Sequence, residues 1–222
     1  MDSIKKCCIV FFLTAKALAA SAAVLVETRE GAPDSKVIFS AVSQTQSDKD
    51  SYSWGRATQP PLRFGQSFVL SADATMEALT LKTVTLTATN ASFVLNIYKV
   101  NALTDSPTTG GAPIYTGSGL LPSAQGPKPG YMTFTLDAPV ALSQGVFYVF
   151  TLSYAGTGSG GLGLYRGTAD AETADTSRFW SSSDGGASYA GTSKIAYLYI
   201  QGTTVVPEPS TAMLLLPGSW PE

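Results

Sequence analysis

Three carboxylates lie close together in one short segment of the chain. Asp170, Glu172 and Asp175 all fall within residues 168–175. Carboxylate oxygens are preferred ligands of Ca²⁺, which takes about six to eight oxygens in all. The spacing of the three residues does not match an EF-hand loop, so an acidic, solvated loop is the plainer interpretation. A Ca²⁺ ion held in this loop is the alternative, and the sequence indicates no other cofactor.

The chain lacks a side chain on which much of enzyme chemistry depends. It contains no histidine, which excludes Ser-His-Asp and Cys-His nucleophiles and imidazole metal ligands. A pair of carboxylates could still hydrolyse a glycosidic bond. The acidic residues considered for that role are Glu77, Asp137, Glu172, Asp175 and Asp184. Because no local context singles out any of them, we do not expect an enzyme, and a glycan-active hydrolase is kept as a weaker alternative.

Aromatic rings in polar segments offer a different chemistry, the binding of sugars. Trp54, Trp180 and Tyr189 lie in Gly- and Ser-rich surroundings, and Arg56 and Arg178 stand two residues from the tryptophans. A ring exposed on a loop can stack on the flat face of a sugar, while a guanidinium supplies hydrogen bonds to its hydroxyls. The plainer interpretation is that these rings cap the ends of the hydrophobic core. The alternative is that the five residues are exposed and contact a glycan.

Nucleic acids and nucleotides are not expected partners. The chain has 14 Lys and Arg residues against 16 Asp and Glu residues, a formal net charge of −2, and so lacks a basic footprint for nucleic acid. The letters G-x-G-x-x-G occur at Gly158–Gly163, but no helical period follows them. A dinucleotide site needs a helix that opens here and presents its amides to phosphate, so we interpret the segment as a loop.

The N-terminal residues have the pattern of a secretory signal peptide. Two lysines precede an apolar run of nine residues, Cys7–Ala15, and small residues with Ala-x-Ala spacing follow. The run is too short for a transmembrane helix, which needs about 18 apolar residues. We therefore assign residues 1–22 to a signal peptide and expect an exported protein, extracellular or at the cell surface. Both cysteines lie in this segment, so we expect the mature chain to have no disulfide and no thiolate metal site.

The C-terminal residues contain a second targeting pattern. The apolar stretch Ala212–Leu216 is directly preceded by Val206, Pro207, Glu208, Pro209, Ser210 and Thr211. This segment resembles the sorting signal of the PEP-CTERM family of exported bacterial proteins. In that family a Pro-Glu-Pro motif precedes a transmembrane helix and a short basic tail. The resemblance implies recognition by an exosortase, and therefore a partner in the sorting and export machinery.

The sequence departs from the family pattern after this motif. The apolar stretch has five residues, and Pro217–Glu222 follows without a basic cluster. Five residues cannot cross a hydrocarbon core of about 30 Å. We therefore interpret residues 203–222 as a degenerate sorting tail with a truncated anchor, and we expect no stable membrane span in this chain.

The segment between the two ends has the pattern of a sheet protein. Polar and apolar residues alternate in short runs, and almost no helical period is found. The clearest run is Val84–Thr89, and the other strong runs are Ser92–Val100, Tyr131–Leu136, Val146–Tyr154 and Ile195–Ile200. In Val146–Tyr154 both sets of alternating positions are apolar, which favours a central strand covered on both faces.

Four weaker runs complete the expected sheets. They are Lys36–Phe39, Gln66–Leu70, Pro113–Tyr115 and Leu162–Tyr165. We interpret 137–145 as the connection between two strong strands, with Gly145 in a left-handed turn. Roughly eight to ten strands joined by Gly-, Pro-, Ser- and Thr-rich loops predict an all-β fold. We expect an antiparallel β-sandwich with jelly-roll-like wrapping over residues 23–202.

These observations together predict an exported cell-surface or extracellular-matrix protein. Its charged residues amount to only 14% of the chain, and a chain without histidine suits an exported scaffold better than a catalyst. The expected role is structural or adhesive, in association with an exopolysaccharide. A carbohydrate-binding module is the alternative function.

Overall fold

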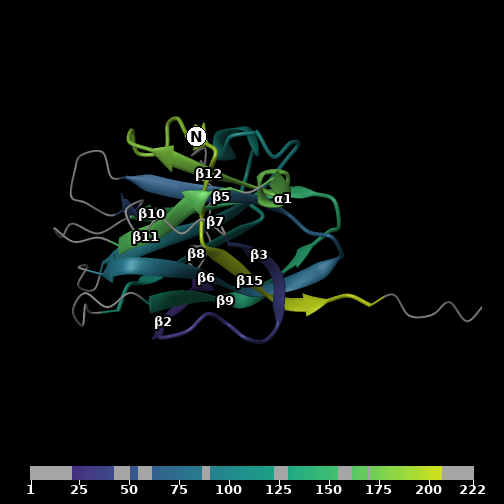
Figure 1. The fold of residues 1–222 in the computed structure, drawn as a ribbon, viewed down its shortest axis with the longest axis horizontal. Helices are drawn as coiled ribbons and strands as arrows, with labels where there is room; N and C mark the ends of the chain where they lie inside the picture. Colours follow the sequence, from purple (N-terminus) through teal and green to yellow (C-terminus); the bar gives the residue numbers. More distant parts are fainter. Residues whose placement is uncertain are drawn as a thin grey trace, which may run out of the picture.

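The computed structural model describes residues 22–42, 51–54, 62–86, 91–122, 130–154, 162–169 and 171–206. In these residues almost every element is a β-strand, and the strands form two sheets that pack face to face (Figure 1). The predicted all-β, antiparallel sandwich is therefore confirmed. Two short helical elements accompany the strands, a 3-10 turn, η1 (Pro107–Thr109), and α1 (Ala171–Ala174).

The first sheet has seven strands. Their spatial order is β1 (Ala22–Ala23), β8 (Tyr115–Leu120), β7 (Ser92–Val100), β10 (Phe147–Tyr154), β5 (Arg63–Val69), β12 (Ser177–Ser182) and β13 (Ala190–Thr192). Neighbouring strands are antiparallel, except that β1 runs parallel to β8. β10 lies between β7 and β5, and all of its residues except Phe147 are buried. This confirms the central strand predicted from its apolar residues.

The second sheet has eight strands around two long ones. β6 (Ala74–Leu86) and β9 (Gly130–Leu142) form its centre. The others are β2 (Leu25–Arg29), β3 (Val37–Ala41), β4 (Ser51–Trp54), β11 (Leu162–Thr168), β14 (Lys194–Ala196) and β15 (Leu198–Thr204). At one end the order is β2-β9-β6-β15-β3. At the other end β11 takes the place of β15 beside β6, and β4 and β14 pair with β11.

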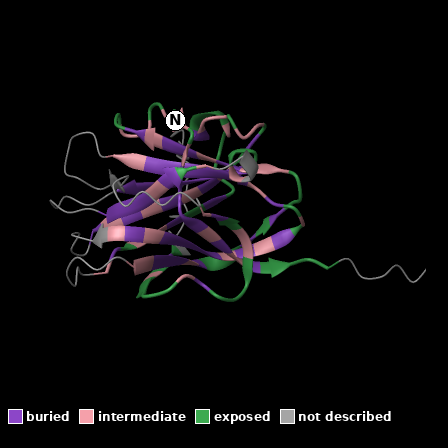
Figure 2. Ribbon diagram, in the orientation of Figure 1, coloured by how far each residue is buried: buried purple, intermediate pink, exposed green. Residues whose placement is uncertain are grey.

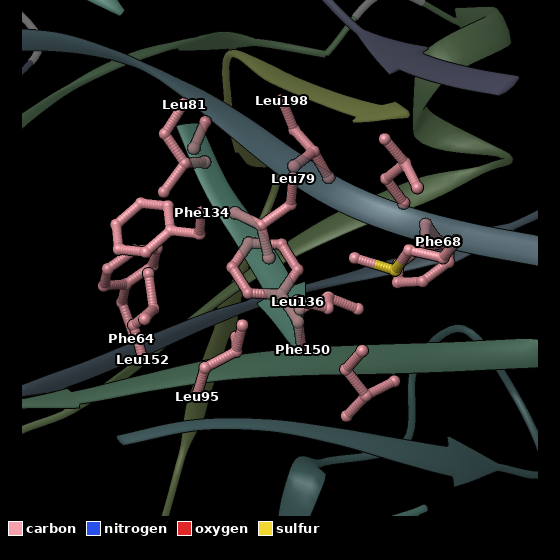
Figure 3. Packing of buried hydrophobic residues seen from close by; sticks show 14 of the residues in the cluster. Phe64, Phe68, Leu79, Leu81, Leu95, Phe134, Leu136, Phe150, Leu152 and Leu198 are labelled. Carbon is pink, nitrogen blue, oxygen red and sulfur yellow. The ribbon is translucent and has the colours of Figure 1, made fainter. Parts of the chain in front are cut away.

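Side chains from the inner faces of both sheets fill the space between them. Phe93, on β7, meets Phe134, on β9, edge to face with 5.3 Å between the ring centroids. Figure 3 shows how phenylalanine and leucine side chains from the two layers interdigitate. The residues that the alternation assigns to the interior of β7 and β9 are all buried, namely Phe93, Leu95, Ile97, Met132, Phe134 and Leu136. Each such side chain contributes about 1.5–3 kcal/mol when it leaves water.

One predicted strand is in fact two. Tyr197 divides the run Ile195–Ile200 between β14 and β15. Its N–H donates a hydrogen bond to the carbonyl of Tyr165 on β11 at 3.3 Å, and its carbonyl accepts one from the N–H of Lys82 on β6 at 3.1 Å. The chain therefore changes partners at Tyr197. Local alternation does not reveal this change, because the residues on both sides are apolar.

The predicted connection over 137–145 is mostly strand. β9 continues to Leu142, and its residues 136–139 form a bulge opposite β6. Pro139 lies in this bulge, where its missing N–H leaves no ladder hydrogen bond unmade. The loop that remains contains Gly145, whose φ of 69° is the left-handed conformation predicted for it.

The other predicted strands agree with the structure. The run Val84–Thr89 overlaps the end of β6 at 84–86, and 87–89 lie outside the described residues. The four weaker runs overlap β3, β5, β8 and β11, the overlap with β8 being Tyr115 alone. From β8 to β12 successive strands alternate between the two sheets, which is consistent with jelly-roll-like wrapping. None of the helices in the described ranges has the length and apolar character that a membrane span requires.

Exposed residues gather at the rim of the sandwich. Figure 2 shows them along the β2–β3 connection and at the end of β15, while most buried residues lie on the strands. Because each sheet packs on the other with one face, its second face points away from the main core. These two outer faces are where the structure can meet a ligand.

Candidate functional site

Part of the outer face of the seven-stranded sheet, around β5, β10 and β12, is covered by chain. Trp180, on β12, is 4% exposed, and its Nε1 donates a hydrogen bond to Ser67 Oγ on β5 at 2.5 Å. Ser67 Oγ donates in turn to the carbonyl oxygen of Leu103, in the connection between β7 and β8, at 3.1 Å. The cluster on this face, which we call the covered face, consists of Val100, Val149 and Trp180 with Phe147 and Tyr189 packed against them.

The Trp180 ring is buried, as the plainer interpretation predicts, and it does not lie exposed on a loop. Trp180 pairs with Gly65 inside the sheet, and η1 in the β7–β8 connection contacts both β7 and β10. The Ser-rich neighbours of Trp180 were interpreted as a loop, but they are strand residues. With 4% of its surface exposed, the ring is covered in this structure, and a sugar could stack on it only if the covering chain moved.

Arg178 packs against the Trp180 ring. Its Cζ lies 5.4 Å from the ring centroid, within the range of a cation–π contact. Its Nε is buried and has no hydrogen-bond partner. Gly191, on β13, makes room for both side chains, because a Cβ there would lie 2.5 Å from Arg178 Nε and 2.8 Å from Trp180 Cζ3. The Arg178 and Trp180 side chains therefore pack directly against the backbone of Gly191, which has no side chain.

Tyr189 lies at the edge of the covered face and is half-buried. Burial raises the pKa of its phenol, while the charge of Arg63 and hydrogen bonds with Arg63 and Thr151 act in the opposite direction. The phenol therefore interacts with groups of this face rather than standing free on a loop.

The five predicted glycan contacts fall into two groups. Arg178, Trp180 and Tyr189 come together on the covered face. Trp54 lies on β4 opposite Leu162, with only its backbone described. Arg56 lies outside the described residues. A glycan contact by any of the five stays a prediction.

The predicted Ca²⁺ loop is described only in part. Asp170 lies outside the described residues, and of Glu172 only the backbone in α1 is described. Asp175 is exposed just after α1. In the part of the chain that the structure describes, no three His, Cys, Asp or Glu side chains gather as metal ligands would. The Ca²⁺ ion therefore stays a prediction, and the present geometry adds no support to it.

Two of the carboxylates considered for glycoside hydrolysis have close partners of other kinds. Glu77 forms an ion pair with Lys36 at 3.0 Å. Asp184 accepts hydrogen bonds from Ser182 Oγ at 2.7 Å and from the N–H of Ser188 at 3.0 Å. These hydrogen bonds hold the pKa of Asp184 well below its usual range, with the bonds from Ser188 the main cause. None of these contacts brings two carboxylates together.

A groove of about 470 Å³ opens where β9 bulges. It is lined by Lys99, Ile114, Tyr115, Ala138, Pro139, Val140, Ala141 and Tyr148. The Tyr115 hydroxyl donates to Asp137 Oδ1 at 2.9 Å. Burial, together with this carboxylate, raises the pKa of Tyr115 far above its usual value. Asp137, also considered for hydrolysis, therefore acts here as the partner of a tyrosine.

The outer face of the eight-stranded sheet carries tyrosines. Tyr131, on β9, and Tyr199, on β15, are both half-buried, and their rings meet edge to face at 6.0 Å. Tyr165 and Tyr197 form a similar pair at 6.4 Å and are buried. Lys82 lies between the pairs, since it is opposite Tyr131 in the sheet and its Nζ stands over the second pair. We call these five residues the tyrosine face.

Lys82 is held in place by aromatic rings. Its Nζ lies 4.5 Å from the centroid of Tyr165 and 5.2 Å from that of Tyr197. A cation within about 6 Å of a ring face is attracted by the ring's quadrupole. This attraction fixes the ammonium group at the face without neutralising its charge.

Hydroxyl and amide groups beside the tyrosines form one ordered chain. Thr80 Oγ1 donates to Gln201 Oε1 at 2.6 Å and lies 2.8 Å from Thr133 Oγ1. Because Thr80 has one hydroxyl hydrogen, Thr133 must be the donor in the second bond. The chain fixes the Gln201 amide oxygen as a hydrogen-bond acceptor, and the amide nitrogen has no hydrogen-bond partner among the described residues.

Tyr199 keeps its proton at any physiological pH. Burial raises the pKa of its phenol to about 12, and the neighbouring Tyr131 adds to the effect. A neutral phenol can donate one hydrogen bond and accept others. The ring pair therefore brings apolar ring surface and polar hydroxyl groups together on the outer side of the sheet.

Sequence reasoning missed the tyrosine face, although part of the signal was present. If Met132 and Phe134 face the core, then Tyr131 and Thr133 must face outward, because successive side chains of a strand alternate. The contribution of Tyr199 and Lys82 has no such local signal. It depends on the pairing of β15 and β9 with opposite edges of β6.

The targeting segments lie almost wholly outside the described residues. Val206 is 78% exposed, whereas the rest of the predicted sorting motif and residues 1–21 are not described. Ala22, which the predicted boundary assigns to the signal peptide, is the first residue of β1. The chain matches no known family model and no curated protein.

Proposed function

We propose that this protein is an exported component of the cell surface or extracellular matrix, with a structural or adhesive role. In this proposal it holds exopolysaccharide on the tyrosine face. The observation that carries the proposal is the half-exposed Tyr131–Tyr199 pair on the outer face of the eight-stranded sheet. The predicted signal peptide and the PEP-CTERM-like segment support the exported location.

The chemistry of the tyrosine face suits a sugar polymer. Aromatic rings cover the apolar face of a sugar, and phenol, hydroxyl and amide groups bond to its hydroxyls. Both kinds of group are present here, since Thr80 lies opposite both Tyr199 and Thr133 in the sheet. The Thr80 hydroxyl bonds to the Gln201 amide. Small ligands prefer enclosed pockets, whereas a sheet face can support an extended chain along its length. A polymer is therefore the better match.

A carbohydrate-binding module that uses the covered face is the second candidate. The stacked Arg178 and Trp180 side chains, with a buried Arg178 Nε that lacks a partner, favour it. It would require the connection that contains Leu103 to move away from Ser67. We rank it second because the tyrosine face needs no such movement.

Affinity electrophoresis of the purified chain in gels that contain purified polysaccharides tests the proposal. We expect Tyr131→Ala and Tyr199→Ala each to weaken binding about fivefold, since an aromatic contact contributes about 1 kcal/mol. Tyr98→Ala is the matched control, because Tyr98 is a half-buried tyrosine on the outer side of β7, in the other sheet. It should leave binding unchanged.

Three outcomes would count against the proposal. Absence of retardation in every polysaccharide would remove the glycan role. Equal losses in the Tyr98 and Tyr131 variants would remove the tyrosine face as the site. Loss of binding in a folded Trp180→Ala variant, with the Tyr131 variant unaffected, would favour the covered face. Export is tested separately, by detecting in the extracellular fraction a processed chain that begins at residue 23.

A further inference from the structure

We infer that the tyrosine face selects anionic polysaccharides, those that carry carboxylate groups along the chain. The inference rests on the proposed function and names the class of glycan that the face would hold. It is carried by two cationic residues that stand on the strands either side of the half-buried Tyr131.

The pairing of three strands places these cations in one row. Arg29 on β2 is opposite Tyr131 on β9, and Tyr131 is opposite Lys82 on β6. Residues that are opposite each other in an antiparallel sheet point to the same side. Neighbouring strands lie about 4.8 Å apart, so the backbones of Arg29 and Lys82 each stand one strand spacing from that of Tyr131, on opposite sides. The Lys82 ammonium group extends toward the rings of Tyr165 and Tyr197. A sugar stacked on Tyr131 would therefore have a cationic residue on the strand to either side.

Neither cation is neutralised within the part of the chain that the structure describes. The ion pair formed there joins Lys36 to Glu77, and neither Arg29 nor Lys82 takes part in it. Arg29 is exposed. Lys82 contacts the rings of Tyr165 and Tyr197 instead of a carboxylate, so its ammonium hydrogens remain available to an anion.

One carboxylate limits where an anion can sit. Glu27 is opposite Thr133, one row along the same face, and it is exposed. Its negative charge repels a carboxylate that approaches Glu27 and Thr133. A carboxylate of the ligand is therefore favoured beside Arg29, Tyr131 and Lys82, which lie side by side on neighbouring strands. Removal of this charge should therefore strengthen the binding of an anionic chain.

The experiment compares two forms of one polymer, polygalacturonate and its carboxyl-reduced, neutral counterpart, by affinity electrophoresis. We expect the acidic form to bind at least about tenfold more tightly at low salt, with the preference lost near 1 M salt, where the screening length falls to about 3 Å. Lys82→Gln and Arg29→Gln should each weaken binding of the acidic form about threefold, and Glu27→Gln should strengthen it about twofold. None should change binding of the neutral form.

Two control variants separate charge from fold. Lys82→Arg keeps the cation and the ring contacts and should retain the preference. Lys99→Gln removes an equal charge from an exposed position on β7, in the other sheet, and should behave as the unsubstituted protein. A charge effect spread over the whole molecule would make Lys99→Gln and Lys82→Gln equivalent, and that result would overturn the inference.

The failure of the inference is distinct from the failure of the proposed function. Equal binding of the acidic and reduced polymers that still depends on Tyr131 would overturn the charge selection and leave the glycan role in place. Binding of neither polymer, nor of any other polysaccharide, would overturn both. Acidic preference that survives in the Arg29→Gln, Lys82→Gln double variant would place the anionic site elsewhere.

Discussion

The two outer faces of the sandwich carry similar side chains but expose them to different extents. Each has a basic residue over an aromatic ring, Arg178 over Trp180 on one face and Lys82 over Tyr165 on the other. On the covered face the β7–β8 connection is hydrogen-bonded over the sheet through Leu103. On the tyrosine face Tyr131 remains half-exposed. The covered face has become a small second core, whereas the tyrosine face has kept a surface that can meet a ligand.

The difference shows what sets the exposure of an aromatic residue in this fold. Trp180 has serine neighbours in sequence, yet a crossing connection buries it. Tyr131 has Met132 as its neighbour, yet it lies on the outside because the strand alternates. Exposure therefore follows the path of the connections over each sheet, and the polarity of the sequence neighbours is a poor guide to it.

The largest expected effect comes from removing the ring at the centre of the covered face. Trp180→Ala should lower the free energy of unfolding by about 3–5 kcal/mol, because it removes a buried ring and leaves a cavity. It also leaves Ser67 without its hydrogen-bond donor. Tyr131→Ala should cost only about 1–2 kcal/mol, since that ring is half-exposed and loses mainly its contact with Tyr199. Denaturant unfolding of the two variants measures the contrast.

In polysaccharide binding the order of the two variants should be reversed, with the larger loss in the Tyr131 variant. Polysaccharide affinity per folded molecule should be unchanged in the Trp180 variant and reduced in the Tyr131 variant. If Trp180→Ala and Tyr131→Ala lower the free energy of unfolding by the same amount, the covered face is not a second core. The distinction between the faces would then be lost.

A smaller effect is expected from adding a single methyl group at the edge of the covered face. In Gly191→Ala the new Cβ would lie 2.5 Å from Arg178 Nε and 2.8 Å from Trp180 Cζ3. Arg178 can swing outward, so we expect a cost of about 1–2 kcal/mol, together with a change in tryptophan fluorescence. Gly31→Ala is the control, because no atom lies within 4 Å of a Cβ built there. Equal stability of the two variants would show that Arg178 and Trp180 are loosely packed.

The fold could be predicted well from sequence where a strand alternates and keeps one partner on each edge. The bounds of β7, Ser92–Val100, agree with its predicted run, because its inner face is strictly apolar. The prediction failed at Tyr197, where the chain passes from β11 to β6 and β15 begins. Strand pairing is a long-range property, and the sequence around Tyr197 carries no mark of it.

The candidate site was harder to predict than the fold. Chemical reasoning identified Trp180 and Arg178 as a pair, and the structure does bring them together. It could not indicate which segment covers Trp180, since the covering chain lies more than seventy residues earlier, at Leu103. Tyr131 could have been found by alternation alone. Its partners Lys82 and Tyr199 are set by the pairing of three strands, which no local pattern encodes.

The smallest expected effect concerns the titration of the tyrosine face at high pH. The folded-state pKa of Tyr199, about 12, lies above the ordinary value of 10.0. The folded chain therefore holds a proton that the unfolded chain releases. The stability linked to this group is complete below pH 10 and is lost as the pH rises through about 12. Ultraviolet difference titration against Tyr199→Phe assigns the transition.

Ligand binding should move this transition on one face only. A polysaccharide chain seated on Tyr131 and Tyr199 would deepen the burial that is the main cause of the shift, and so raise the pKa of Tyr199 further. Tyr131→Phe should lower the pKa toward 10, though only in part, because burial remains. Tyr189, on the covered face, owes its raised pKa to its own surroundings and should not respond to polysaccharide. If polysaccharide raised the pKa of Tyr189 and left that of Tyr199 unchanged, the covered face would be the binding face. The reason is that a ligand raises the pKa of the phenol that it buries.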